Sequence, residues 1–328
     1  MLVLVAIYSD FASWCIPDAE LDALRQQFQD YAFLRADSDQ ETLARIADAD
    51  VAFSSRINPA HLDAAHRLAW VHSPAAGIGS MLFPAMVESD VILTNSRGIS
   101  ARAIAEHTVL VTLALFRKLP LAFERQRTRT WAQNEVFAEG RPIRTLRGAR
   151  VLLVGLGAIG SQAAHLFAAL GATVTAIRRR VSEPAPHGIA RVLPPSQLHA
   201  ALPESDVVVV AAPQTSETVH LIGADELAAM KEDAVLVNVS RGKLVDEAAL
   251  VEALDAGRLR GAALDVFEHE PLPAGSPLWD RSDVIVTPHV SGFYERYWPD
   301  ARALFADNLR RFAAGQPLRN VVDKRAGY

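Results

Sequence analysis

The sequence predicts an α/β protein made of two doubly wound parallel-sheet domains, and three observations support this. Its 328 residues exceed the length typical of one domain. Short apolar runs alternate with amphipathic helical patterns along almost the whole chain, which is typical of parallel strands joined by helices. Gly155, Gly157 and Gly160 follow one of those runs directly, in a G-x-G-x-x-G pattern that opens a helix.

The first series of elements fills the N-terminal part of the chain. Short apolar runs, as expected of strands buried on both faces, lie at 2–7, 31–34, 51–54, 68–72 and 91–93. Amphipathic segments at 18–28, 39–47 and 59–66 predict helices between them. A longer helix is predicted from Ser100 to Phe116, with Ser100 as its N-cap.

A second series begins near Ala149. Its predicted strands lie at 151–155, 173–177, 206–212, 234–239, 261–265 and 283–287. A helix over 160–170 is closed by Gly171. The final amphipathic stretch, 299–315, predicts a helix with Pro299 in its first turn.

Composition excludes several classes of function. A net charge of −5 gives no reason to expect nucleic acid or an anionic membrane as a partner. The single cysteine, Cys15, excludes intramolecular disulfides and fits a reducing compartment, so we expect a cytoplasmic protein. No apolar run approaches the ~18 residues of a membrane span, and the apolar start lacks a signal peptide's basic region. His61 and His66 have no partner at metal-ligand spacing, so no metal is expected.

The glycine motif predicts a dinucleotide site. Gly155 allows a tight turn, Gly157 lets the backbone approach a pyrophosphate, and Gly160 lets helix and strand pack closely. The helix that starts there offers unpaired N–H groups to the phosphates. Because the motif follows a strand and opens a helix within a βαβ unit, we favour this interpretation over a purely structural turn.

The next strand bears on the choice of cofactor. A domain that binds NAD commonly carries an acidic residue about 20 residues past the glycines. Here Arg178, Arg179 and Arg180 follow Ile177, and the first acidic residue is Glu183. Guanidinium groups bind a phosphate with forked, charge-assisted bonds, so the sequence favours NADP(H). A basic surface turn that tolerates NAD(H) is the alternative.

Three polar residues follow apolar strands, at the edge where parallel sheets place their ligands: Arg241, Glu270 and His289. Hydride transfer to a 2-oxo acid needs a cation that holds the carboxylate and polarises the ketone, and an acid that protonates the alkoxide. A carboxylate beside the imidazole orients it and favours its protonated form. Glu268 is the alternative to Glu270 in that role, and His269 is expected at the surface.

The glycine motif and the three strand-end residues lie in segments 155–160, 238–242, 264–271 and 287–291. These segments resemble the D-isomer-specific 2-hydroxyacid dehydrogenase family. The similarity includes Asn95-Ser-Arg-Gly98 and Ala105-Glu-His107, and so spans nearly the whole chain. Three further features resemble the glyoxylate/hydroxypyruvate-reducing branch of the family: the arginine cluster, Asn320-Val-Val-Asp-Lys324, and Gly327-Tyr328.

The resemblance implies a Rossmann cofactor domain, residues 99–289, inserted into a flavodoxin-like substrate domain, residues 1–98 and 290–328. It also implies a homodimer built largely on the helix over 100–116. Arg241 would bind the substrate carboxylate and carbonyl, His289 would be the acid/base, and Glu270 would orient it. Asp265 would hold the nicotinamide carboxamide. Further cofactor contacts are expected at Ala158, Ile159, Pro213 and Ser240, and the substrate carboxylate is expected on Ala76, Gly77 and Ile78.

The identity of the acid stays open. Arg56 is a candidate for meeting a polar substituent, with a surface position as the alternative. Tyr294, Tyr297 and Trp298 are candidates for a pocket wall, with interdomain packing as the alternative. Glyoxylate and hydroxypyruvate are favoured over bulkier 2-oxo acids.

Two other functions are compatible with parts of the same pattern but are disfavoured. A cofactor-sensing corepressor of the same family is disfavoured because the chain has no long disordered extension. Formate dehydrogenase is disfavoured because its pattern places an amide where this chain has Glu270.

Overall fold

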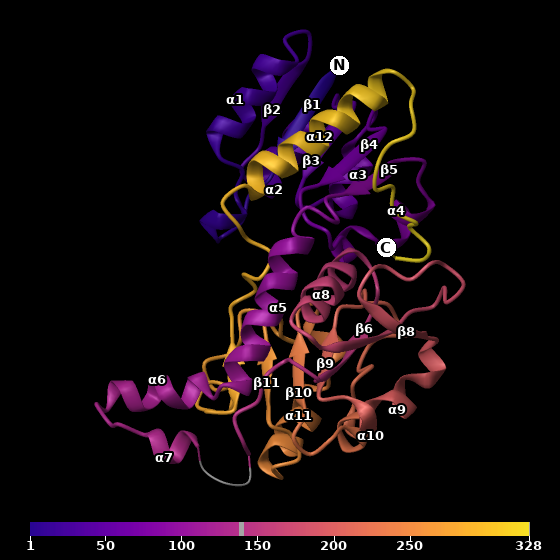
Figure 1. Cartoon of the computed structure of the whole chain (residues 1–328). Helices are drawn as coiled ribbons and strands as arrows, with labels where there is room; N and C mark the ends of the chain where they lie inside the picture. Colours follow the sequence, from indigo (N-terminus) through magenta and orange to yellow (C-terminus); the bar gives the residue numbers. More distant parts are fainter. Residues whose placement is uncertain (138–140, 328) are drawn as a thin grey trace. The chain divides into compact units, whose positions relative to one another are not determined.

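The computed structural model describes residues 1–137 and 141–327, and the chain divides into two compact units (Figure 1). The terminal unit comprises Met1–Ile99 and the residues from Tyr294 onward, and the central unit comprises Ser100–Phe293. The sequence places the chain crossings at 98/99 and 289/290, and the structure has them at 99/100 and 293/294. Tyr328 of the closing motif lies outside the described residues.

The terminal unit is built on a five-stranded parallel sheet in the order β2-β1-β3-β4-β5, the flavodoxin-like arrangement. Val3 and Val5 belong to one apolar core and Leu4 and Ala6 to another, so the sheet is covered on both faces. Its strands are β1 (Leu2–Ala6), β2 (Ala32–Arg35), β3 (Val51–Ser54), β4 (Trp70–Ser73) and β5 (Ile92–Asn95). Its helices are α1 (Asp18–Gln27), α2 (Asp39–Arg45), α3 (Pro59–Ala64), α4 (Pro84–Glu88) and α12 (Tyr297–Ala313).

The last helix, α12, packs onto the first sheet, as the resemblance implied. The ring of Phe305 stacks on Phe53 of β3 with centroids 4.3 Å apart and on Trp70 of β4 at 5.3 Å. All three side chains are fully buried. Both ends of the chain therefore belong to one folded unit.

The central unit contains a seven-stranded parallel sheet in the order β12-β11-β10-β9-β6-β7-β8, which extends the Rossmann order by one strand. Its strands are β6 (Arg150–Val154), β7 (Thr173–Ile177), β8 (Ile189–Leu193), β9 (Val207–Val210), β10 (Val235–Asn238), β11 (Gly261–Leu264) and β12 (Val284–Val286). Its helices are α5 (Ala101–Phe116), α6 (Leu119–Arg127), α7 (Gln133–Val136), α8 (Ala158–Ala169), α9 (Leu198–Ala201), α10 (Ala224–Ala229) and α11 (Glu247–Asp255). The predicted fold class is confirmed.

Three local details differ from the predictions or add to them. β8 was not predicted, because none of its side chains is fully buried and no continuous apolar run marks it. α8 begins at Ala158 and not at residue 160, because Gly157 already serves as its N-cap. Ser100 does occupy the N-cap of α5, but its side chain makes no capping hydrogen bond. Within the described residues, none of the helices combines the length and the apolar character that a membrane crossing requires.

Candidate active site

The three glycines between β6 and α8 have different surroundings. Gly155 has a φ of +108°, and a Cβ there would lie 2.6 Å from the backbone of Ala211. A Cβ on Gly160 would lie 2.3 Å from the carbonyl oxygen of Gly155, so this glycine lets the helix approach the strand. A Cβ on Gly157 would meet no atom within 4 Å, so the polypeptide itself does not require glycine there. That open space, beside a helix N-terminus without a side-chain cap, fits a dinucleotide's pyrophosphate.

The three arginines after β7 make different contacts. The side chain of Arg178 is only 11% exposed, and its guanidinium donates to the carbonyl oxygens of Glu183 and Pro184. Arg178 therefore closes the turn to which it belongs. Arg179 and Arg180 keep 50% and 73% of their side chains exposed. These two are the arginines that solvent, and hence a phosphate, reaches most readily.

His289 and Glu270 are in direct contact. Nδ1 of His289 lies 2.7 Å from Oε2 of Glu270, and Oε1 of the same carboxylate accepts the N–H of Phe267 at 3.0 Å. Burial opposes the ionisation of Glu270, but these bonds and the charges of His289 and Arg241 outweigh it and hold the pKa of Glu270 below its usual range. Nε2 of His289 has no partner in the part of the chain that the structure describes, so it is available to a substrate.

Glu268, the alternative partner of His289, has a different contact. Its Oε1 accepts the N–H of Glu247 at 3.0 Å, at the start of α11, and the carboxylate of Glu247 accepts the N–H of Glu268. The two residues thus join α11 to the segment after β11. His269 is exposed, as expected. Glu270 is therefore the carboxylate that can orient the imidazole.

The turn that carries Arg241 is fixed by Asn238 at the end of β10. Nδ2 of Asn238 donates to the carbonyl oxygen of Arg241 at 3.0 Å, and its Oδ1 accepts the N–H of Ser240 at 3.2 Å. The guanidinium of Arg241 donates to the carbonyl oxygen of Ser240 at 2.6 Å. The Ser240 hydroxyl donates to the carbonyl oxygen of Ala212, next to Pro213. The expected cofactor residues Ser240 and Pro213 thus lie on neighbouring turns after β10 and β9.

Asp265 shapes the loop that presents His289. It is 1% exposed, and its carboxylate accepts the hydroxyl of Thr287 at 2.6 Å and the N–H groups of Val290 and Ser291, each at 3.0 Å. The N–H of His289 donates to the carbonyl oxygen of Asp265 at 2.9 Å. His289 has a φ of 52°, a value uncommon outside glycine, and these bonds hold it there. The expected contact of Asp265 with a carboxamide stays a prediction.

The expected carboxylate-binding residues, Ala76, Gly77 and Ile78, follow β4 in the terminal unit. Ala76 and Gly77 are exposed, whereas Ile78 is buried. None of their three N–H groups donates to an acceptor within residues 1–137 and 141–327. Successive unpaired N–H groups on a turn form the donor set that binds an anion.

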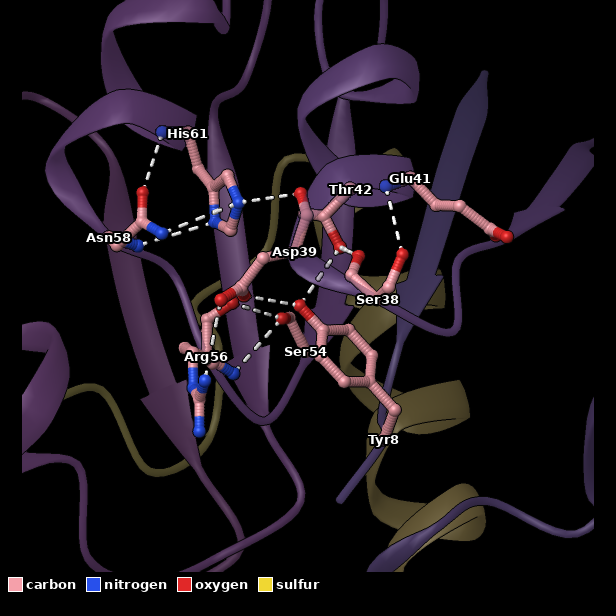
Figure 2. Close-up of polar contacts among 9 residues, drawn as sticks. All are labelled: Tyr8, Ser38, Asp39, Glu41, Thr42, Ser54, Arg56, Asn58 and His61. Carbon is pink, nitrogen blue, oxygen red and sulfur yellow. Dashed lines mark hydrogen bonds and ion pairs between the residues drawn. The ribbon is translucent and has the colours of Figure 1, made fainter. Parts of the chain in front are cut away.

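Figure 2 shows a polar cluster around Asp39, at the carboxyl edge of the terminal sheet. Tyr8, which follows β1, donates its hydroxyl to Oδ1 of Asp39 at 2.6 Å. Arg56, which follows β3, lies 3.4 Å from Oδ2 of Asp39 and keeps 60% of its side chain exposed. The bond from Tyr8 is the main cause that lowers the pKa of Asp39, while burial and that bond raise the pKa of Tyr8 to about 12. Arg56 is thus held by a carboxylate and still accessible.

Tyr8 and Asp39 are not among the residues predicted for the site. The available signal was position, because Tyr8 lies in the loop just after β1 and Asp39 begins α2, the helix that follows β2 of the same parallel sheet. His61 serves the fold here: its ring accepts from the N–H of Asn58 at 3.4 Å, and its Nε2 lies 3.1 Å from the carbonyl oxygen of Asp39. No group of three or more His, Cys, Asp or Glu residues is placed to bind a metal ion in the described ranges.

The aromatic residues proposed for the pocket wall are held within the terminal unit. Tyr297 is 4% exposed. The hydroxyl of Tyr294 donates to the Asp300 carboxylate at 2.8 Å. The hydroxyl of Tyr297 donates to the carbonyl oxygen of Pro74 at 3.0 Å. Nε1 of Trp298 donates to the carbonyl oxygen of Ser13 at 3.3 Å. These contacts anchor the start of α12 in its own unit.

Comparisons with known proteins identify the family of this chain. Residues 109–291 match the model of the D-isomer specific 2-hydroxyacid dehydrogenase, NAD binding domain. A glyoxylate reductase from Thermofilum pendens is 34% identical over 297 residues, which cover 88% of this chain and 85% of that protein. A D-3-phosphoglycerate dehydrogenase from Archaeoglobus fulgidus is 30% identical over 269 residues, which cover 82% of this chain. The aligned part spans only 50% of that relative's length.

A solved structure extends the comparison to the whole fold. It is a D-isomer specific 2-hydroxyacid dehydrogenase from Xanthobacter autotrophicus Py2 in complex with NADPH and MES. The two chains are 30% identical and superpose with a TM-score of 0.84, over 100% of this chain and 99% of that one.

Proposed function

Because the chain belongs to the D-isomer specific 2-hydroxyacid dehydrogenase family, we propose that it transfers a hydride between NADP(H) and a small 2-oxo or 2-hydroxy acid. The observation that carries the proposal is the contact of His289 with Glu270, at the edge of the sheet where Arg241 also stands. This set provides a proton donor, the carboxylate that orients it and a cation for the substrate.

The contacts of each of these residues support a specific role in the reaction. Since Glu270 occupies Nδ1, the Nε2–H of His289 is the group that would give its proton to the carbonyl oxygen of the 2-oxo acid. Arg241 would bind the substrate carboxylate and polarise the carbonyl. The N–H groups of Ala76–Ile78, in the terminal unit, would be donors to a carboxylate. Bound NADPH would supply a hydride to the carbonyl carbon. In the reverse direction His289 accepts the hydroxyl proton.

The proposal favours NADP(H) over NAD(H). Arg179 and Arg180 stand after β7 with exposed side chains, where a 2′-phosphate would require positive charge. Arg178 would support them by shaping the turn, because its guanidinium is bonded to backbone carbonyls. The Xanthobacter relative, which was solved with NADPH, supports the same choice.

Glyoxylate and hydroxypyruvate are the proposed substrates. The relative from Thermofilum pendens, a glyoxylate reductase, supports the smaller acid. The position of Arg56 supports hydroxypyruvate, the larger acid. Arg56 follows β3, the turn proposed to bind the carboxylate follows β4, and β3 and β4 are paired strands. Its guanidinium would meet a polar group on the third carbon, which hydroxypyruvate has and glyoxylate lacks.

The test is kcat/KM for glyoxylate, hydroxypyruvate, pyruvate and phenylpyruvate, each with NADPH and with NADH. We expect the first two acids with NADPH to be the best pairs. Arg56→Ala should lower kcat/KM for hydroxypyruvate about tenfold relative to glyoxylate, as loss of one hydrogen bond to a charged group would. A preference for phenylpyruvate would contradict the small-acid proposal. Binding of NADPH with no turnover of any acid would favour a cofactor-sensing protein.

We also propose a homodimer. The α5–α7 region exposes large apolar side chains that a second copy would cover: Leu110, Phe123, Trp131 and Phe137. Trp131 is 90% exposed, which is unusual for an unpartnered tryptophan. Light scattering at micromolar concentration should give twice the mass of 35.6 kDa. Trp131→Ser combined with Phe137→Ser should weaken the dimer, and a monomeric wild type would contradict it.

A cytoplasmic site of action completes the proposal. The single cysteine, Cys15, is unpaired, as in proteins of reducing compartments. Fractionation of cells that express the tagged protein would test this location.

A further inference from the structure

Four consecutive carbonyl groups accept hydrogen bonds, from Ser73 at the end of β4 to Ala76 in the turn that follows it. The carbonyl oxygen of Ser73 accepts the hydroxyl of Ser96 at 3.0 Å, and that of Ala75 accepts the N–H of Ser96 at 3.1 Å. The carbonyl oxygen of Pro74 accepts the hydroxyl of Tyr297 at 3.0 Å, and that of Ala76 accepts Nδ2 of Asn95 at 2.7 Å. Consecutive carbonyl oxygens from Ser73 to Ala76 are therefore fixed by donors that are themselves buried.

This arrangement sets the direction of the N–H groups. In a trans peptide the C=O of one residue and the N–H of the next point in opposite directions. Because the carbonyl oxygens of Ala75 and Ala76 face Ser96 and Asn95, the N–H groups of Ala76 and Gly77 face away from them. These are the N–H groups that have no acceptor within the described residues. The donors behind the turn thus determine where an anion can bind in front of it.

Ser96 is itself held by a buried chain of hydrogen bonds. Nε1 of Trp70 donates to the Thr94 hydroxyl at 2.7 Å, and that hydroxyl lies 2.7 Å from Nδ1 of His72. Nε2 of His72 lies 3.2 Å from the hydroxyl of Ser96, which donates to the carbonyl oxygen of Ser73. Trp70, His72, Thr94 and Ser96 are each at most 1% exposed, so no solvent competes for these bonds.

The donor in each bond can be assigned. The single hydroxyl proton of Ser96 goes to Ser73, because a carbonyl oxygen only accepts. Nε2 of His72 must then donate to Ser96. Burial lowers the pKa of His72 to about 3, so its ring is neutral and Nδ1 accepts from Thr94. This chain of hydrogen bonds therefore requires one tautomer of His72, with its hydrogen on Nε2.

We infer that His72 is a positioning residue for substrate binding: it fixes Ser96 and, through Ser96, the turn whose N–H groups receive the carboxylate of the 2-oxo acid. This inference rests on the proposed function. Leucine or phenylalanine would fill the space, but neither could supply the Nε2–H that holds Ser96. His72 acts through other residues and does not touch the reacting atoms.

The experiment compares His72→Gln, whose amide nitrogen extends to about the position of Nε2, with His72→Asn, whose shorter amide does not reach Ser96. Ser96→Ala breaks the last link of the chain. Ser89→Ala is the matched control, because its hydroxyl also donates to a backbone carbonyl in this unit, that of Met86 at 2.9 Å. For each variant, kcat and KM for glyoxylate, the inhibition constant of oxalate and the Kd of NADPH are measured.

We expect His72→Asn and Ser96→Ala to raise KM and the oxalate constant about tenfold while kcat and the Kd of NADPH change little, because uniform binding is lost. His72→Gln and Ser89→Ala should stay near wild type. Unchanged KM in Ser96→Ala, or equal losses in both His72 variants, would overturn the inference. So would an NMR spectrum of the folded protein at pH 7 that shows the hydrogen on Nδ1.

The same variants separate this inference from the proposed function. If the wild type turns over no 2-oxo acid, the proposed function fails. Amide hydrogen exchange at residues 73–78 still tests the positioning role, because Ser96→Ala should speed exchange there and Ser89→Ala should not. Equal exchange in all variants would overturn it. If His72→Asn does not fold, Ser96→Ala alone provides both readouts.

Discussion

Gly242, the residue after Arg241, lies directly against the backbone of Phe267, so that a Cβ on Gly242 would be 1.8 Å from the carbonyl carbon of Phe267. The N–H of Phe267 in turn donates to Glu270. The turn that carries the cation is therefore packed against the turn that carries the carboxylate, without room for any side chain. This close approach ties the two groups to one geometry.

Gly242→Ala should consequently destabilise the protein and lower activity together. Overpacking a well-packed site costs about 1–3 kcal/mol, and here the obstacle is backbone, which yields less than a side chain. The melting temperature (Tm), measured by thermal denaturation, and kcat should both fall. Gly275→Ala is the control, because a Cβ there meets no atom within 4 Å. A Gly242→Ala variant with unchanged Tm would show that the two turns move apart easily.

The glycine motif offers a separation of binding from stability. Gly157→Ala should leave Tm nearly unchanged, because its Cβ meets open space, and should weaken NADPH binding at least about tenfold by obstructing the pyrophosphate. Gly155→Ala should lower Tm, because of its positive φ and its contact with Ala211. Fluorescence titration with NADPH and thermal denaturation check both. Full NADPH affinity in Gly157→Ala would contradict the proposed position of the pyrophosphate.

His289→Ala should lower kcat by about 10²–10⁴-fold while NADPH still binds, since the general acid is lost. Steady-state kinetics and the Kd of NADPH check this, and activity within a few-fold of wild type would exclude His289 as the donor. His269→Ala is the matched control, because that histidine is exposed nearby and has no expected role.

Glu270→Gln should be milder and should change the pH dependence. Glu270 is ionised over the working range because its pKa is lowered. With that negative charge removed, Nδ1 of His289 faces a neutral amide in place of a carboxylate, so the pH–rate profile of kcat for reduction should change. The pH–rate profiles of the two enzymes provide the measurement. An unchanged profile would mean that Glu270 does not act through His289.

Cofactor selectivity should depend on the exposed arginines. Replacing Arg179 and Arg180 together by serine should lower kcat/KM with NADPH by at least about tenfold and leave that with NADH nearly unchanged, because only NADPH carries the 2′-phosphate. Arg191→Ser, on β8 with a side chain 53% exposed, is a control for general loss of positive charge. Equal use of both cofactors by the wild type would instead support the basic surface turn.

The sequence by itself determined the two parallel sheets, the glycine motif and the three strand-end residues Arg241, Glu270 and His289. These follow from local rules, because periodicity specifies helices and strands, and parallel strands bring their carboxyl ends to one edge. β8 escaped prediction because an edge strand with partly exposed side chains has no such pattern.

The tertiary structure alone decided how the polar atoms are paired. Only the path of the loops places Glu270 on His289 and Glu268 on the N–H of Glu247. Only folding turns Arg178 back onto its own loop and joins His72 to Ser96 across paired strands. Hydrogen bonds act over about 3 Å and depend on direction, so they are set by the packed backbone and not by spacing in the sequence.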